Sequence, residues 1–145
     1  MLRHFEYLGV PTPNRAAAIL QSRDKVACLQ HLAAHRLPIP PTVAIDSPDQ
    51  LEESLEALGG LPIILKRSRG TQGVGVIKIG ALDQLRATVE TLWQLGEPIF
   101  LQRFIAESQG KELRLFVIGD EVVAAMERIS APDDCKNALK RAILI

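Results

Sequence analysis

The chain contains little cysteine, few aromatic side chains, no net charge and no long apolar run. Its two cysteines, Cys28 and Cys135, form no C-x-x-C pair, which argues against a zinc site and is typical of a reducing cytosol. Seventeen basic and seventeen acidic residues cancel, which removes the electrostatic basis for binding nucleic acid. No apolar run approaches the roughly 18 residues of a membrane helix, and Met1–Tyr7 lacks the apolar centre of a signal peptide. The sequence therefore predicts a cytoplasmic protein without a nucleic-acid or membrane partner.

A lysine followed by a glycine-rich loop is the most informative segment of the chain. The apolar run Leu61–Leu65 ends in Lys66, and the following loop contains Gly70, Gly73 and Gly75 before a β-branched stretch. This order predicts a strand, a loop and a second strand. Glycine lets backbone N–H groups approach a ligand closely, and a lysine at the start of the loop supplies a positive charge for a phosphate. The segment favours a nucleotide whose phosphates lie under the loop.

Two common nucleotide-binding loops do not fit this segment. A P-loop places its lysine after the last glycine and continues into a helix, whereas Val74–Ile77 is strand-like. A dinucleotide-binding fingerprint has the spacing G-x-G-x-x-G between a strand and a helix, and here that spacing is reversed between two strands. A glycine-rich hairpin that covers phosphates remains. A glycine-rich turn without a ligand also fits the spacing.

The pattern of apolar residues predicts an α+β fold with an antiparallel sheet. Asn14 is a candidate N-cap for a helix over Arg15–Gln21, and Ser22 or Asp24 for the next helix. A capping box at Ser47–Gln50 starts a third helix. The remaining expected elements are a helix over Asp83–Gly96 with Leu85, Val89, Leu92 and Trp93 inward, strands over Thr42–Ile45 and Pro98–Phe104, and a hairpin of Glu112–Ile118 and Glu121–Glu127 around Gly119-Asp120.

Five motifs follow one another along the chain: Arg23-Asp24-Lys25, Pro62–Lys66, Gly70–Val76, Leu101–Ile105 and Glu112-Leu113-Arg114, with Val117–Arg128 after them. In this order and spacing they resemble the ATP-grasp superfamily, and most closely its RimK-like ligases, which add glutamate to the C-terminus of a small-subunit ribosomal protein. The resemblance extends from Leu2 to about Arg128. The family fold implies an ATP-grasp N-terminal subdomain plus part of the second lobe, with antiparallel sheets and flanking helices.

The resemblance also implies a set of ATP-binding residues. Lys25 matches a lysine that reaches a phosphate from the start of a helix, and Lys66 matches one that contacts phosphate and the adenine side. Glu112 matches the acidic residue that accepts hydrogen bonds from the ribose. The phosphate lid matches Gly70, Thr71, Gln72, Gly73 and Gly75, and the hinge matches Gln102, Arg103, Phe104 and Ile105, with the backbone of Arg103 and Phe104 at the adenine edge.

Several of these residues have a second interpretation. Without the resemblance, Lys25 fits an exposed helix lysine, and Glu112 fits an edge-strand surface charge equally well. Arg114 and Arg128 are candidate phosphate or substrate contacts, and each is equally suited to pair with a carboxylate such as that of Glu112 or Glu127. His31 and His35 are four residues apart, as metal ligands can be, but no third ligand is evident and a solvated helix face is favoured.

Three departures from the family pattern limit what the resemblance implies. Arg103 stands where the family usually has a glutamate at the hinge. In the stretch near the end, Ala138 replaces an asparagine, and Ala142 and Ile143 replace glycines. The sequence stops before the family's metal-binding Asp, Glu and Asn, so the Mg²⁺ of the complete family enzyme has no ligands here and no catalytic residue is assigned. We expect a partial ATP-grasp domain, truncated at both ends, with a first lobe over 14–100, a hinge and second-lobe start over 101–129, and a divergent tail over 130–145.

The implied function is that of an ATP-binding fragment of a carboxylate–amine ligase. Such an enzyme forms an acyl phosphate from ATP and then an amide or peptide bond, here by adding glutamate to a ribosomal protein or a related acceptor. Because phosphoryl transfer needs a defined magnesium site, we expect the fragment alone to be inactive. A non-catalytic nucleotide-binding module and an inactive gene remnant, produced by a frameshift or premature stop, are the alternatives. A protein or amino-acid acceptor is the expected partner besides ATP, and self-association would cover exposed apolar surface.

Overall fold

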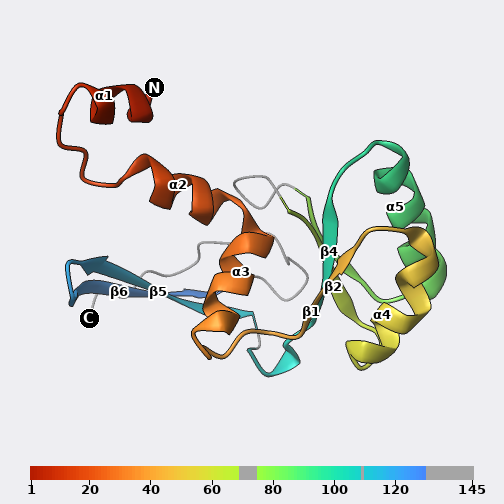
Figure 1. The fold of residues 1–145 in the computed structure, drawn as a ribbon. Coiled ribbons are helices and arrows are strands. Elements are labelled where there is room, and N and C mark those ends of the chain that lie inside the picture. The colour runs from red at the N-terminus through yellow and green to blue at the C-terminus, as the bar shows by residue number, and fades with distance from the viewer. Residues whose placement is uncertain (69–74, 109, 130–145) are drawn as a thin grey trace.

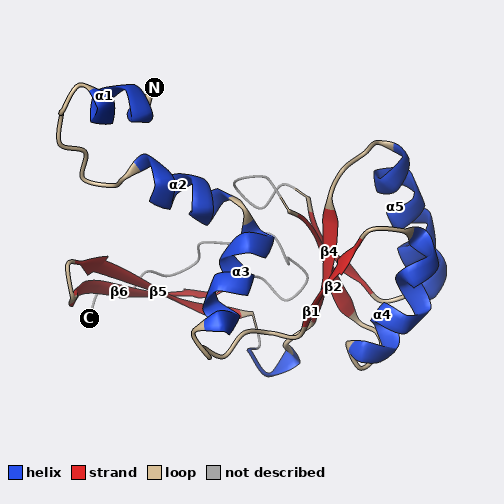
Figure 2. Ribbon diagram, in the orientation of Figure 1, coloured by secondary structure: helices blue, strands red, loops and turns tan. Residues whose placement is uncertain are grey.

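A computed structural model describes residues 1–68, 75–108 and 110–129, which form two antiparallel sheets with flanking helices (Figures 1 and 2). The predicted α+β class is confirmed. The helices are α1 (Leu2–Tyr7), α2 (Ala16–Arg23), α3 (Lys25–Ala34), α4 (Leu51–Ala57) and α5 (Leu82–Gln94), with 3-10 turns η1 (Pro48–Gln50) and η2 (Ala106–Ser108). The strands are β1 (Thr42–Ile45), β2 (Ile63–Arg67), β3 (Val76–Ile79), β4 (Ile99–Arg103), β5 (Lys111–Ile118) and β6 (Glu121–Ile129).

The larger sheet has the strand order β1-β4-β2-β3, and all its neighbouring strands are antiparallel. Strand β2 pairs with β3 on one side and with β4 on the other, so that Leu65 lies opposite both Ile77 and Leu101. Side chains alternate between the faces of a strand. Ile63 and Leu65 are fully buried on one face, which α4 and α5 cover (Figure 1), and Lys66 therefore belongs to the other face.

The two helices that cover the core face use the apolar pattern that the sequence predicts, with one exception. The capping box at Ser47–Gln50 is present, and α4 follows it. On α5, Leu85 and Val89 are fully buried, but Trp93 is 54% exposed, so its predicted inward position is wrong. At 100° per residue, Trp93 lies about 80° around the helix from Leu85 and falls outside the buried stripe. α5 is the longest helix in the described part of the chain, and no helix there is long and apolar enough to cross a membrane.

The first turns of α2 and α3 are capped in different ways, α3 by the residue directly before it and α2 by a residue distant in the sequence. The side chain of Asp24 accepts a hydrogen bond from the N–H of Ala27 (3.1 Å), which confirms it as the cap of α3. The prediction that Asn14 caps α2 is wrong. Glu6 of α1, a helix that the sequence analysis missed, accepts from the N–H of Ala16 instead (2.8 Å). A cap supplied from ten residues away has no local sequence signature, whereas an Asp directly before a helix does.

The second sheet is the predicted β5–β6 hairpin, with its turn at Gly119-Asp120. Gly119 has a φ of 61°, the left-handed region that tight hairpin turns require. Every residue of β5 is exposed, including Leu113 (70%) and Phe116 (62%). Among the described residues, no further strand pairs with this hairpin. Strand β4 belongs to the larger sheet although it crosses residue 100, where the sequence places the end of the first lobe. The division into lobes stays a prediction.

We expect Leu65→Ala to lower the free energy of unfolding by about 2–5 kcal/mol, because it removes a fully buried side chain at the centre of the sheet. Leu113→Ala removes the same atoms from an exposed position and should change stability by less than about 0.5 kcal/mol. Urea unfolding followed by circular dichroism measures both changes. Equal losses in the two variants would contradict the assigned core.

Candidate functional site

Two lysines from different elements come together at the face of the larger sheet that lies opposite α4 and α5. Lys66 lies near the end of β2, and its ammonium donates a hydrogen bond to the side-chain oxygen of Gln102 on β4 (2.6 Å). Lys25 is the first residue of α3, and its ammonium donates to the backbone carbonyl of Arg67 (3.2 Å), the residue directly after Lys66. The two positive charges therefore meet at the end of β2 although they are 41 residues apart in the chain.

The surroundings of Lys66 disfavour its positive charge. Burial of the ammonium, followed by the nearby charge of Lys25, lowers the pKa of Lys66 from 10.5. Desolvation and a like charge both penalise the protonated form, and an anionic ligand would reverse the penalty. A buried ammonium also requires hydrogen-bond acceptors, and the described acceptor here is the neutral amide of Gln102. The pair is thus suited to a ligand that carries several negative charges.

A chain of hydrogen bonds fixes the amide of Gln102. Its NH₂ group donates to the hydroxyl of Thr42 on β1 (2.9 Å), and that hydroxyl donates to the carbonyl of Pro40 (2.8 Å). Only 7% of Gln102 is exposed. Because the NH₂ group is engaged on one side, the carbonyl oxygen of the amide is directed at Lys66. Thr42 and Pro40 were not identified as site residues from the sequence, because their contribution depends on the pairing of β1 with β4.

At the expected hinge, the structure places Arg103 at the end of β4 with an exposed side chain. The N–H of Arg103 donates to the carbonyl of Pro41 (3.0 Å) and is therefore already engaged. The ring of Phe104 lies under the ammonium of Lys78, with 4.1 Å between the nitrogen and the ring centroid. This cation–π contact adds a third lysine near the predicted set. Lys78 was not identified from the sequence, although its position between Ile77 and Ile79, which pack on the core, predicts that it lies on the same face as Lys66.

Glu112 forms ion pairs within its own hairpin. Its carboxylate accepts hydrogen bonds from Arg114 (2.9 Å) and Arg128 (2.6 Å). Burial alone would raise the pKa of Glu112, but the hydrogen bonds and charges of the two arginines outweigh it and lower that pKa. Arg114 and Arg128 had two interpretations, contact with phosphate or substrate and pairing with a carboxylate. In the structure both pair with the carboxylate of Glu112. Glu112 contacts these arginines rather than the lysine pair of the sheet.

The loop residues predicted to cover phosphate lie mostly outside the described residues; these are Gly70, Thr71, Gln72 and Gly73. Gly75 is described and has a φ of 79°, a conformation that favours glycine. A Cβ atom at Gly75 would lie 2.6 Å from the Cδ atom of Arg67. The end of the glycine-rich segment thus requires glycine both for its backbone conformation and for the close approach of Arg67.

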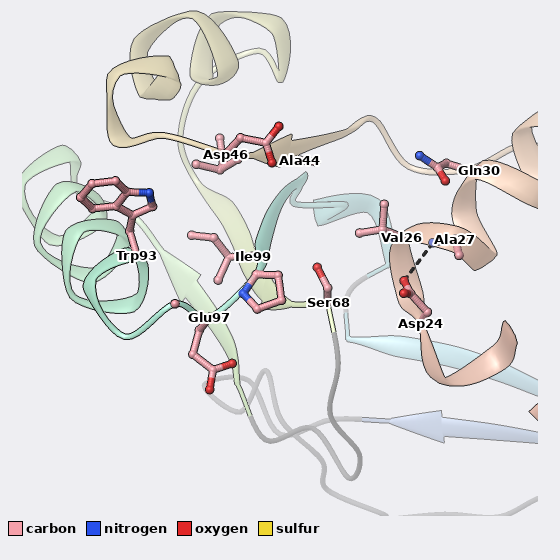
Figure 3. A pocket seen from close by; sticks show the side chains of 13 residues that line it. Asp24, Val26, Ala27, Gln30, Ala44, Asp46, Ser68, Trp93, Glu97 and Ile99 are labelled. Carbon is pink, nitrogen blue, oxygen red and sulfur yellow. Dashed lines mark hydrogen bonds between the residues drawn. The ribbon is translucent and has the colours of Figure 1, made fainter. Parts of the chain in front are cut away.

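A groove of about 730 Å³ lies next to the lysine pair, between the start of α3 and the end of α5 (Figure 3). Its acidic lining residues are Asp24, Asp46 and Glu97, and Trp93 borders it from α5. Neither lysine of the pair lines it. Asp24 and Asp46 repel a polyphosphate, while Glu97 is paired with Arg67, so the charges favour the lysine pair over this groove as a phosphate site.

Within the described residues, no group of three His, Cys, Asp or Glu side chains could hold a metal ion. The rings of His31 and His35 lie 4.4 Å apart, and Nδ1 of His35 is 2.8 Å from the carbonyl oxygen of His31. The pair thus makes local contacts on an exposed helix face, as the sequence analysis favours. We assign no metal ligand to the described part of the chain.

A family model described as the RimK-like ATP-grasp domain matches residues 22–143. The probable alpha-L-glutamate ligase of Xanthomonas campestris pv. campestris (strain B100) is 43% identical over 139 residues, which cover 96% of this chain and 48% of that protein. The chain spans less than half the length of that protein, and 35% of the probable alpha-L-glutamate ligase of Rhodopirellula baltica, which it also matches.

Solved structures show the same fold. The crystal structure of a RimK domain ATP-grasp protein from Sphaerobacter thermophilus has a TM-score of 0.72 and 28% identity, and the match covers 85% of this chain and 47% of that one. The ATP-grasp ligase PsnB, complexed with minimal precursor, Mg and ADP, has a TM-score of 0.71 and 24% identity, with 99% and 43% covered.

We predict that the stability of this chain rises with pH below 10.5 because of Lys66. In the window between its lowered folded pKa and 10.5, the unfolded chain binds more protons at this residue, so the free energy of unfolding increases with pH. Lys66→Met should remove this contribution and flatten the slope. Urea unfolding at several pH values from about 7 to 10 measures it, with Lys111→Met as the matched control at an exposed position. An identical slope in wild type and Lys66→Met would contradict the prediction.

Proposed function

The chain belongs to the RimK-like ATP-grasp family, and from that membership we propose that it forms the nucleotide-binding part of a ligase that joins a carboxylate to an amine. The observation that carries the proposal is the pair of lysines, Lys25 and Lys66, gathered at the end of β2. Their mutual repulsion, and the burial of Lys66, are relieved by a ligand with several adjacent negative charges. The triphosphate of ATP is such a ligand.

The other parts of the nucleotide are assigned from the sequence motifs. We assign the adenine edge to the hinge around Arg103 and Phe104, through backbone groups other than the Arg103 N–H, which bonds to Pro41. The ribose is assigned to Glu112, which would exchange part of its arginine pairing for ribose hydroxyl groups. The segment Gly70–Gly75 is assigned to the phosphates because its glycines leave backbone N–H groups accessible. These assignments support a first lobe over 14–100 and a hinge with the start of a second lobe over 101–129.

In the proposed reaction, the terminal phosphoryl group of ATP passes to a substrate carboxylate, and ADP leaves. The attacking amine then displaces phosphate from the acyl phosphate and forms an amide. The lysine pair holds the phosphates and stabilises the charge that develops on them, which is the main contribution that a protein makes to such a transfer. Because curated relatives carry the name probable alpha-L-glutamate ligase, we propose glutamate as the amino acid added, with a ribosomal or related protein as acceptor.

In this proposal Mg²⁺ is bound by the phosphates of the nucleotide rather than by side chains of the described residues. Mg²⁺ is commonly held by substrate phosphates together with one or two carboxylates. The described residues offer no group of three ligands, so no step is assigned to a metal-binding side chain here.

We predict that ATP binds to the purified chain and that Lys66→Ala and Lys25→Ala each raise the Kd about tenfold or more, because each removes a charged hydrogen-bond donor to phosphate. Isothermal titration calorimetry with and without Mg²⁺ measures the affinity. Lys111→Ala, at the exposed start of β5, is the matched control and should leave the Kd unchanged. A folded wild-type chain that fails to bind ATP would refute the proposed site, as would unchanged binding by Lys66→Ala.

A turnover assay then separates ligase activity from binding alone. ADP release that depends on Mg²⁺ and on glutamate with an acceptor protein supports the ligase. Binding of ATP without ADP release supports a nucleotide-binding module that lacks catalysis in this chain.

A further inference from the structure

Arg67 connects three separate segments at the end of β2. Its N–H donates to the carbonyl of Gly75 (3.1 Å), and its own carbonyl accepts from the ammonium of Lys25 (3.2 Å). Its guanidinium donates through Nε and Nη2 to the same carboxylate oxygen of Glu97, at 2.9 and 2.6 Å. One residue thus joins the start of α3, the beginning of β3 and the segment before β4.

The side chain of Arg67 reaches Glu97 by crossing Gly75. The Cδ and Cγ atoms of Arg67 lie 2.6 and 2.9 Å from the position of a Cβ at Gly75, so only glycine leaves room for this path. The ion pair is partly sheltered, since the two side chains are 33% and 34% exposed. Two hydrogen bonds from a rigid guanidinium to a carboxylate define the position of both groups more tightly than a single contact would.

The residue after Arg67 extends this connection. The N–H of Ser68 donates to the carbonyl of Pro98 (2.8 Å), next to Glu97, and the carbonyl of Ser68 accepts from the N–H of Lys25 (3.1 Å). The backbone at the end of β2 is therefore attached to both the backbone and the side chain of Lys25. The position of Lys25 relative to Lys66 depends on where this strand end lies.

We propose that Arg67 and Glu97 are positioning residues of the nucleotide site, whose ion pair fixes the end of β2 and thereby holds the ammonium of Lys25 beside that of Lys66. The inference rests on the proposed function for its biological meaning. The two lysines repel each other, so in the absence of a ligand their proximity requires a structural cause. The Arg67–Glu97 pair contributes to that cause by fixing the strand end to which Lys25 bonds. A site that is arranged before the ligand arrives loses less entropy when phosphate binds.

A first experiment tests the position of Lys25 without any ligand. The pKa of Lys66 is followed by NMR of ¹³C-labelled lysine side chains, with its signal identified by its absence in Lys66→Met. The groups beside Lys66 are the ammonium of Lys25 and the neutral amide of Gln102. We expect Glu97→Ala to raise the pKa of Lys66 toward 10.5, because Lys25 is released from its neighbourhood. Loss of a nearby carboxylate by itself can only lower a lysine pKa, so a rise means that Lys25 has moved away or that Lys66 has become more solvated. In a Lys25→Met background only the second cause remains, so a smaller rise there assigns the difference to Lys25.

A second experiment measures the consequence for binding. Glu97→Ala should raise the Kd for ATP about threefold to tenfold, a modest factor because partly exposed ion pairs contribute less than buried ones. The Kd for adenosine, measured by NMR titration, should stay unchanged because adenosine carries no phosphate. Glu97→Gln and Arg67→Lys, which keep part of the contact, should give intermediate values for ATP. Glu90→Ala, at an exposed position on α5, is the matched control.

The outcomes separate this inference from the proposed function. An unchanged or lowered Lys66 pKa in Glu97→Ala overturns the positioning role, and so does an equal loss of affinity for ATP and adenosine. If the wild-type chain fails to bind ATP, the proposed function is refuted, while the Lys66 pKa still decides whether the ion pair sets the spacing of the lysines.

Discussion

The placement of β2 between two antiparallel neighbours is the constraint on which the rest of this structure depends. Because both edges of β2 are paired, its side-chain alternation is fixed: Leu65 enters the core beneath α4 and α5, and Lys66 must face the opposite side. The same pairing brings Gln102 of β4 to the ammonium of Lys66. A shift of one residue in the pairing of β2 would bury the lysine in the core and expose the leucine. The register that stabilises the core is therefore also the register that places Lys66 in the site.

Features encoded by neighbouring residues could be predicted from the sequence. Asp24 lies next to the helix that it caps, and Gly119 lies in the turn that needs its backbone freedom. The motifs also indicated Lys25, Lys66 and Gln102 as a set, but not how they contact one another. The cap that Glu6 provides for α2 and the pairing of Arg67 with Glu97 join residues distant in sequence, and only the tertiary fold brings them together.

The charges around the strand end are divided between two adjacent regions. The lysine pair lies at the Arg67–Ser68 segment, and the neighbouring groove, which Ser68 also lines, contains Asp24, Asp46 and Glu97. Arg67 neutralises Glu97 at the boundary. A polyanion is thus attracted by the two lysines and repelled by Asp24 and Asp46 of the groove, although the net charge of the whole chain is zero.

The strand order β1-β4-β2-β3 also constrains how the chain folds during synthesis. β4 lies between β1 and β2, and the hydrogen bond from Gln102 to Thr42 spans 60 residues. A nascent chain that has emerged from the ribosome only as far as β3 can form the local β2–β3 hairpin, but β1 has no neighbour to pair with. β4, one of the two inner strands, is the last strand of this sheet to be made, so the sheet closes in one late step rather than growing strand by strand.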